Sequence, residues 1–137
     1  MAHDDRIKTL EEIKRVSKRG GLICFSSHNL LYDKIFDIKP SRHPLKFLLA
    51  IYRYVWLVAL NKSRKQLMRN DYAIINDGAH NFSLKTYYIK PLKQIEQLEE
   101  LQFKNIRMFS LDGKEVAGGL ELSSLKDCWV YYLCAVA

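Results

Sequence analysis

The sequence lacks the features that define several large classes of protein. It contains three cysteines and no CxxC pair, which excludes a disulfide scaffold and a zinc ribbon. It has only six glycines and no GxGxG run, so no glycine-rich nucleotide-binding turn is present. No apolar segment opens the chain, because MAHDDRIKTLEEIKR is polar and charged from its third residue onward. With 48% apolar and 27% charged residues over 137 positions, the default expectation is one reduced, cytoplasmic, globular domain.

Acidic residues are absent from one internal segment. Between Ile38 and Asn70 the chain has eight basic residues and no acidic ones. The eight are Lys39, Arg42, Lys46, Arg53, Lys62, Arg64, Lys65 and Arg69. The net charge of +7, from 22 basic and 15 acidic residues, therefore belongs to this segment, and the rest is close to neutral. Such a surface suits nucleic acid, anionic lipid or an acidic substrate, and sign alone does not choose among them.

The same segment carries an apolar run from Phe47 to Leu60. The run is too short for a comfortable membrane span and has Arg53 in its middle, where a charge is costly. It predicts a helix packed between a sheet and a partner surface, with an interfacial membrane helix as the alternative. Four residues, Tyr52, Arg53, Tyr54 and Trp56, superficially suit stacking on nucleic acid, but the surrounding Leu, Ile and Val residues favour a helix core.

Hydrophobic periodicity and turn signals predict an alternation of helices and strands. Helices are expected over 4–19, over 45–69 as one helix or two, and over 91–102. The run 22–25 predicts a strand buried on both faces, because it shows no polar alternation. Extended arms over 72–75 and 82–89, strands over 105–111 and 127–136, and a loop over 118–126 complete the prediction. Cys24, Cys128 and Cys134 lie in apolar runs and are expected to be buried small hydrophobes.

Three stretches, taken in order, resemble the C-terminal half of a class I S-adenosylmethionine-dependent methyltransferase. Arg6 to Asn29 (RIKTLEEIKRVSKRGGLICFSSHN) is similar to that family's helix with the pattern Leu-x-Glu-Ile-x-Arg-Val, its glycine pair and its fifth strand. Thr86–Ile89 (TYYI), a helix and then Phe103 resemble the approach to its sixth strand, with Gln102 in place of the common glycine. The aromatic stretch 129–136 is similar to its antiparallel seventh strand.

The resemblance implies an α/β fold, namely the C-terminal part of a Rossmann-like methyltransferase sheet. It also implies a helical insertion over 30–70 that acts as a lid, and methyl transfer from S-adenosylmethionine to an unidentified acceptor. The family holds this cofactor with a glycine-rich turn after its first strand and an acidic residue after its second. Neither is present in this sequence. Residues 1–137 are therefore expected to be one partial domain, whose cofactor-binding N-terminal half lies in another chain or is lost.

The best local site candidate is Ser26-Ser27-His28-Asn29, which ends the buried strand. Ligands in open α/β sheets gather beyond the carboxyl ends of strands. His28 is predicted to be the base that deprotonates the acceptor, and Ser27 and Asn29 are predicted to bind it. The alternative is that Ser and Asn simply end the strand and cap the next helix. Because neighbours on a strand point to opposite faces, one hydroxyl of the Tyr87-Tyr88 pair is expected in the pocket, and Tyr87 is assigned to it.

No metal site is predicted. Asp77, His80 and Asn81 lie in a segment rich in turn formers, and a turn explains them better than a ligand set does. The expected partners are the methyl acceptor, of which a small molecule is one candidate, and a complementing N-terminal half or a second copy of the chain. The alternative function is a non-catalytic remnant or interaction module that pairs with a partner chain or binds a membrane surface through residues 45–69. Nucleic acid is disfavoured.

Overall fold

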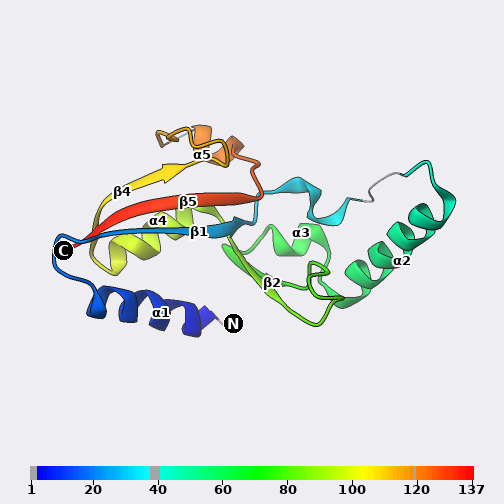
Figure 1. Cartoon of the computed structure of the whole chain (residues 1–137), viewed down its shortest axis with the longest axis horizontal. Coiled ribbons are helices and arrows are strands. Elements are labelled where there is room, and N and C mark those ends of the chain that lie inside the picture. Colours follow the sequence, from blue (N-terminus) through cyan, green and yellow to red (C-terminus); the bar gives the residue numbers. More distant parts are fainter. Residues whose placement is uncertain (1–2, 38–40, 119) are drawn as a thin grey trace.

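A computed structural model of the chain describes residues 3–37, 41–118 and 120–137 (Figure 1). In this part, five strands form one mixed sheet in the order β2-β3-β1-β5-β4. The strands are β1 (Leu22–Asn29), β2 (Tyr72–Ile75), β3 (Thr86–Ile89), β4 (Phe103–Phe109) and β5 (Trp129–Val136). The helices are α1 (His3–Val16), the 3-10 helix η1 (Asp33–Phe36), α2 (Pro44–Leu60), α3 (Arg64–Leu67), α4 (Pro91–Glu100) and α5 (Leu120–Ser124). The predicted α/β fold is confirmed at this level.

The centre of the sheet is the long antiparallel pair of β1 and β5. Their register runs from Leu22 opposite Ala135 to His28 opposite Trp129. On its other side β1 meets β3 in parallel, but only at His28 and Asn29. The last strand is therefore antiparallel to the first, as predicted for the stretch 129–136.

One face of the sheet is covered by helices. Leu10 of α1, Leu98 of α4 and Leu122 of α5 pack in one cluster with alternate residues of β5. Those alternate residues are Val130, Tyr132, Cys134 and Val136. The prediction that Cys134 is buried is confirmed. The helix predicted over 91–102 begins at Pro91, whose fixed φ suits the first helical position.

Strand β1 includes Ser26 to Asn29, the residues expected to end it, because Trp129 and its neighbours extend the antiparallel pairing that far. The strand also corrects one prediction. It is not buried on both faces, since Leu22 is 72% exposed and Cys24 is exposed. The reason is that the helices of the described residues cover only the face to which Phe25 and Ser27 point.

The basic segment forms two helices separated at Asn61-Lys62-Ser63. Ser63 and Gln66 form a capping box that starts the short α3. The longer α2 projects away from the sheet and contacts η1, so the prediction that it packs against the sheet is wrong (Figure 1). In the described ranges, no helix is both long and apolar enough to cross a bilayer. Lys39 lies outside the described residues.

The sequence predicts a loop over 118–126, but this stretch contains α5. Leu122 is 3% exposed and packs into the main core, and this burial fixes a short helix where propensity alone gave no signal.

Candidate functional site

The candidate site lies at the carboxyl end of β1, where its two neighbours meet it. His28 is paired with Tyr88 on β3 and with Trp129 on β5. The imidazole centroid lies 5.0 Å from the ring of Tyr88 and 4.8 Å from the ring of Trp129, tilted in both cases. His28 is thus held in an aromatic setting at the end predicted for the site.

Burial controls the protonation of His28. Its half-buried position lowers the pKa of the imidazole, the Asp77 carboxylate opposes this, and the Arg6 guanidinium adds to the lowering. The net shift is downward, so the ring is neutral at neutral pH and one nitrogen is free to accept a proton. This is the state that a general base requires.

Ser27 and Asn29 lie on the opposite face of β1 from His28, because side chains alternate along a strand. Ser27 is buried on the helix-covered face of the sheet. The Asn29 side chain donates from Nδ2 to the Leu125 carbonyl at 2.8 Å and accepts from the Leu31 N–H at 2.9 Å. Asn29 therefore fixes the turn after the strand, and the structure does not bring these two residues together with His28.

Tyr87 also points away from His28. Its hydroxyl lies 2.8 Å from His3 Nδ1, and the Arg6 guanidinium carbon lies 5.1 Å from the centroid of its ring. Tyr88, the other member of the pair, is on the His28 face. The expectation that the pair divides between two faces is confirmed, but the residue beside His28 is Tyr88 and not Tyr87.

Tyr88 forms one wall of a cleft of about 570 Å³ between α2, η1 and the turn that follows β2. Its hydroxyl donates to Asp77 Oδ2 at 2.9 Å. Burial and then the nearby Asp77 carboxylate raise the pKa of Tyr88, so its phenol stays protonated. The Tyr88 ring has His28 beside it and the cleft in contact with it, which links the predicted base to a space that can hold a ligand.

The cleft combines aromatic and aliphatic walls with charged groups. Its walls include Tyr32, Ile35, Leu49, Tyr54, Leu57 and Phe82. Three cations, Lys34, Lys46 and Arg53, line it together with the carboxylates of Asp37 and Asp77. Apolar walls with a few convergent charges are typical of small-molecule sites. A second hollow of about 450 Å³ lies at the far end of β5, between the ends of α1 and α4.

Sequence analysis missed most of this cleft. One signal for it was present, because Lys46 and Arg53 are seven residues apart and so share a face of a helix. Lys34 and Asp77 gave no such signal, since they come from separate segments that meet only in three dimensions. Among the residues that the structure describes, no group of three or more His, Cys, Asp or Glu side chains is placed to bind a metal.

The described residues do not fit S-adenosylmethionine as the family holds it. Gly78 is the glycine that lines the cleft, with φ at +86°. A Cβ at Gly78 would meet the Phe82 ring at 3.3 Å, so the space above this backbone is filled by the chain's own side chain. Three cations around the cleft also disfavour a cationic sulfonium.

Comparisons of the chain with family models, curated proteins and solved structures found no match.

Proposed function

We propose that this chain forms the acceptor-binding, C-terminal part of an S-adenosylmethionine-dependent methyltransferase, and that protein outside these residues holds the cofactor. The observation that carries the proposal is the position of the cleft. It lies beyond the carboxyl end of β1, and its Tyr88 wall is in contact with a neutral histidine. The antiparallel pairing of β5 with β1 and the sequence resemblance add support.

The chain's own residues provide binding and proton removal. The acceptor lies against the apolar wall of the cleft, with its reactive atom directed past the Tyr88 ring toward His28. His28 takes the proton from an acceptor O–H or N–H group, and the Asp77 carboxylate stabilises the imidazolium that forms. The hydrogen bond between Tyr88 and Asp77 fixes both side chains, so the acceptor meets a preorganised wall.

The charges of the cleft indicate the class of acceptor. Lys46 and Arg53 of α2 and Lys34 of η1 line it. Two carboxylates oppose three cations, and one of these carboxylates, Asp77, already accepts a hydrogen bond from Tyr88. The balance favours an anionic molecule with an apolar or aromatic body.

Binding is tested by NMR with a panel of small aromatic carboxylates that carry a hydroxyl or an amine. We expect at least one compound to shift the amides of Tyr88 and Arg53, and Arg53→Glu to abolish the shift. His28→Gln should leave binding unchanged. A panel in which no compound perturbs the cleft contradicts the proposal.

Transfer is tested in an extract of the source organism from which the gene has been deleted, supplied with tritiated S-adenosylmethionine and the acceptor found by NMR. Adding the wild-type chain should restore methylation of that acceptor, and adding the His28→Gln chain should not. Calorimetry should show no binding of S-adenosylmethionine to the chain alone. Restored methylation with His28→Gln would show that His28 is not the base. Binding of S-adenosylmethionine to the chain alone would contradict the proposal that protein outside these residues holds the cofactor.

A further inference from the structure

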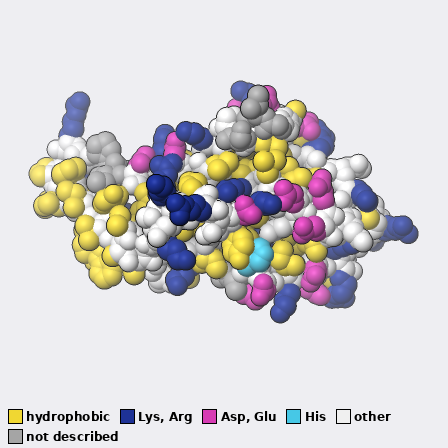
Figure 2. Space-filling view, turned by 180° about the vertical axis from the view of Figure 1, so that it is seen from behind, with side chains coloured by type: hydrophobic (Ala, Val, Ile, Leu, Met, Phe, Trp, Pro, Cys, Tyr) yellow, Lys and Arg dark blue, Asp and Glu magenta, His cyan; other side chains and the backbone are white. Residues whose placement is uncertain are grey.

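Helix α2 exposes apolar side chains where a helix on a protein surface normally has polar ones. Its outer face consists of Leu45, Leu48, Tyr52, Val55 and Trp56, all on the side away from the cleft. Leu45 is 70% exposed, Leu48 61% and Val55 58%. Figure 2 shows apolar side chains gathered over the projecting end of the molecule. An exposed apolar surface of this extent marks a binding surface.

The polar side chains of α2 lie on the opposite side. Lys46 and Arg53 line the cleft, next to Leu57, which is the buried residue of the helix. Both cations of the helix are thus on the cleft side, with Leu49, Tyr54 and Leu57, and the outer face is entirely apolar and aromatic. Packing within the chain cannot account for the outer face, because the described part of the chain places little against α2 except η1.

The stretch of sequence that contains α2 carries charge of one sign, and the carboxylates of Asp37 and Asp77 lie on the cleft side of the helix. From 41 to 70 the sequence has no Asp or Glu. Arg42 precedes the helix and Lys62, Lys65 and Arg69 follow it, all exposed and, in the described ranges, none in an ion pair. A second copy docked on this face would bring two sets of cations together without a carboxylate between them. An anionic surface is the occupant that complements both the apolar face and the charge.

We propose that α2 binds the surface of an anionic lipid bilayer. The helix lies in the plane of the membrane, with its outer face at the boundary between headgroups and acyl chains. Its 17 residues span about 25 Å along that plane. Tyr52 and Trp56, in edge-to-face contact at 6.2 Å, place amphipathic rings at the headgroup level. Arg42, Lys62, Lys65 and Arg69 contact lipid phosphates and carboxylates. This inference stands independently of methyl transfer.

The test is flotation of the whole chain with vesicles of phosphatidylcholine alone and of phosphatidylcholine with phosphatidylserine. We expect the chain to float with the anionic vesicles and to remain largely unbound with the neutral ones. High salt should release it, because headgroup attraction is screened. Failure to float with anionic vesicles overturns the proposal.

Paired variants separate the contribution of the apolar outer face to vesicle binding from that of the surrounding cations. Leu48→Glu combined with Val55→Glu should abolish flotation, whereas Val16→Glu combined with Leu111→Glu, at apolar residues 69% and 52% exposed elsewhere, should not. Replacing Lys62, Lys65 and Arg69 by Gln should weaken binding by about fivefold for each charge removed. The matched change of Lys8, Lys18 and Lys104, all exposed, should have little effect. An equal loss of vesicle binding in both members of a pair would contradict a specific lipid-binding surface on α2.

Sedimentation velocity tests whether a second copy of the chain, rather than lipid, covers the outer face. The chain without lipid should be a monomer in both the wild-type and the Leu48→Glu, Val55→Glu forms. A wild-type dimer that this double variant dissociates, together with no flotation, would assign the outer face to a second copy and overturn the lipid proposal.

Discussion

Helices α4 and α2 divide their polar and apolar side chains in opposite ways. In α4, Leu98 is fully buried in the main core with Ile95 packed against it, and the three glutamates are exposed, although Gln94 is also buried. In α2, Leu57 is buried while most of the apolar residues face solvent. The partner of α4 is therefore the sheet of its own chain. For α2 we propose a partner outside the chain, and the cations from 41 to 70 are the reason for proposing an anionic one.

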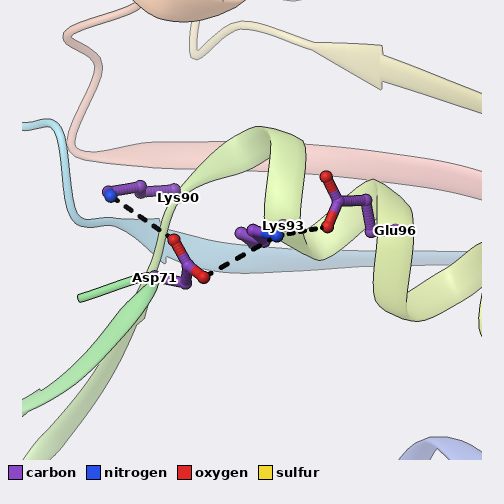
Figure 3. A network of polar contacts seen from close by, with 4 residues as sticks. All are labelled: Asp71, Lys90, Lys93 and Glu96. Carbon is purple, nitrogen blue, oxygen red and sulfur yellow. Dashed lines mark hydrogen bonds and ion pairs between the residues drawn. The ribbon is translucent and has the colours of Figure 1, made fainter.

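The outer side of α4 shows what an ordinary solvated face looks like here. Asp71, which precedes β2, pairs with Lys90 at 3.5 Å and with Lys93 at 3.7 Å, and Lys93 also pairs with Glu96 at 2.6 Å (Figure 3). Acids and bases alternate on this surface and neutralise each other. The segment that contains α2 differs, because from 41 to 70 its cations have no carboxylates among them in the sequence, and Asp37 and Asp77 line the cleft on the other side of the helix.

Truncating one leucine in each helix should give the largest contrast. Leu98→Ala removes a side chain that is 0% exposed in the main core and should lower the free energy of unfolding by about 2–5 kcal/mol. Leu48→Ala, at a residue 61% exposed, should change it by less than about 0.5 kcal/mol. Urea denaturation of the lipid-free chain measures both. Equal losses would mean that α2 is already packed in solution.

A smaller effect is expected at Asn61, which fastens the end of α2 to the turn after β2. Its Nδ2 donates to the Leu57 and Asn76 carbonyls at 2.7 and 2.8 Å, and its Oδ1 accepts from the Asn76 N–H at 2.8 Å. Asn61→Ala should destabilise the chain by about 1–3 kcal/mol, because Asn76 is buried and loses its partners. Hydrogen exchange should quicken in α2 and stay unchanged in α4. Equal quickening in both helices would show that Asn61 supports the whole fold instead.

The pH dependence of stability should differ modestly between the wild type and a His28 variant. Burial lowers the pKa of His28 below its ordinary value of 6.5, so the unfolded chain binds a proton that the folded chain resists. The contribution of His28 to the free energy of unfolding is therefore fully present above pH 6.5 and is lost as the pH falls below 6.5. Urea midpoints measured on both sides of pH 6.5 should change less in His28→Gln than in the wild type. Identical slopes would contradict the burial of this imidazole.

The smallest effect on the free energy of unfolding is expected when the ion-pair network of Asp71, Lys90, Lys93 and Glu96 is disrupted (Figure 3). The hydrogen bond and charge of Glu96 raise the pKa of Lys93, with Asp71 adding to this, but the groups are solvated. Lys93→Ala should leave the urea midpoint unchanged within error, because exposed ion pairs contribute little. A clear loss would show that these pairs, rather than burial, hold α4 in place.

The sequence predicted those elements whose partners lie in the same chain. The stripe Leu92, Ile95, Leu98 and Leu101 located α4, and the aromatic run from Trp129 located β5. Periodicity reports a face buried against neighbouring elements, and Ile95, Leu98 and Leu101 are on that face, whereas Leu92 is 48% exposed. The prediction that β1 is buried on both faces was wrong, since an apolar run does not show how many faces of the strand are covered. Leu22 and Cys24 are exposed for this reason.

The sequence located the candidate residues along β1 but not the face of the sheet on which each of them lies. His28 lies at the end of β1 as expected, but the strand continues past Phe25, and alternation then turns Ser27 and Asn29 to the other face. The parallel register that sets Tyr88 beside His28 is a long-range property, so local pattern could not choose between Tyr87 and Tyr88. The basic, apolar character of residues 45–69 was evident, but its exposure depended on the direction in which α2 projects.

The most direct test of the outer face uses the fluorescence of Trp56 in a Trp129→Phe chain, where it is the remaining tryptophan. On titration with vesicles containing phosphatidylserine, its emission should shift to shorter wavelength and be quenched by lipids brominated near the headgroup end of their acyl chains. The same titration with phosphatidylcholine alone should produce little change. An emission spectrum that stays that of a solvated indole while anionic vesicles are added would contradict the account.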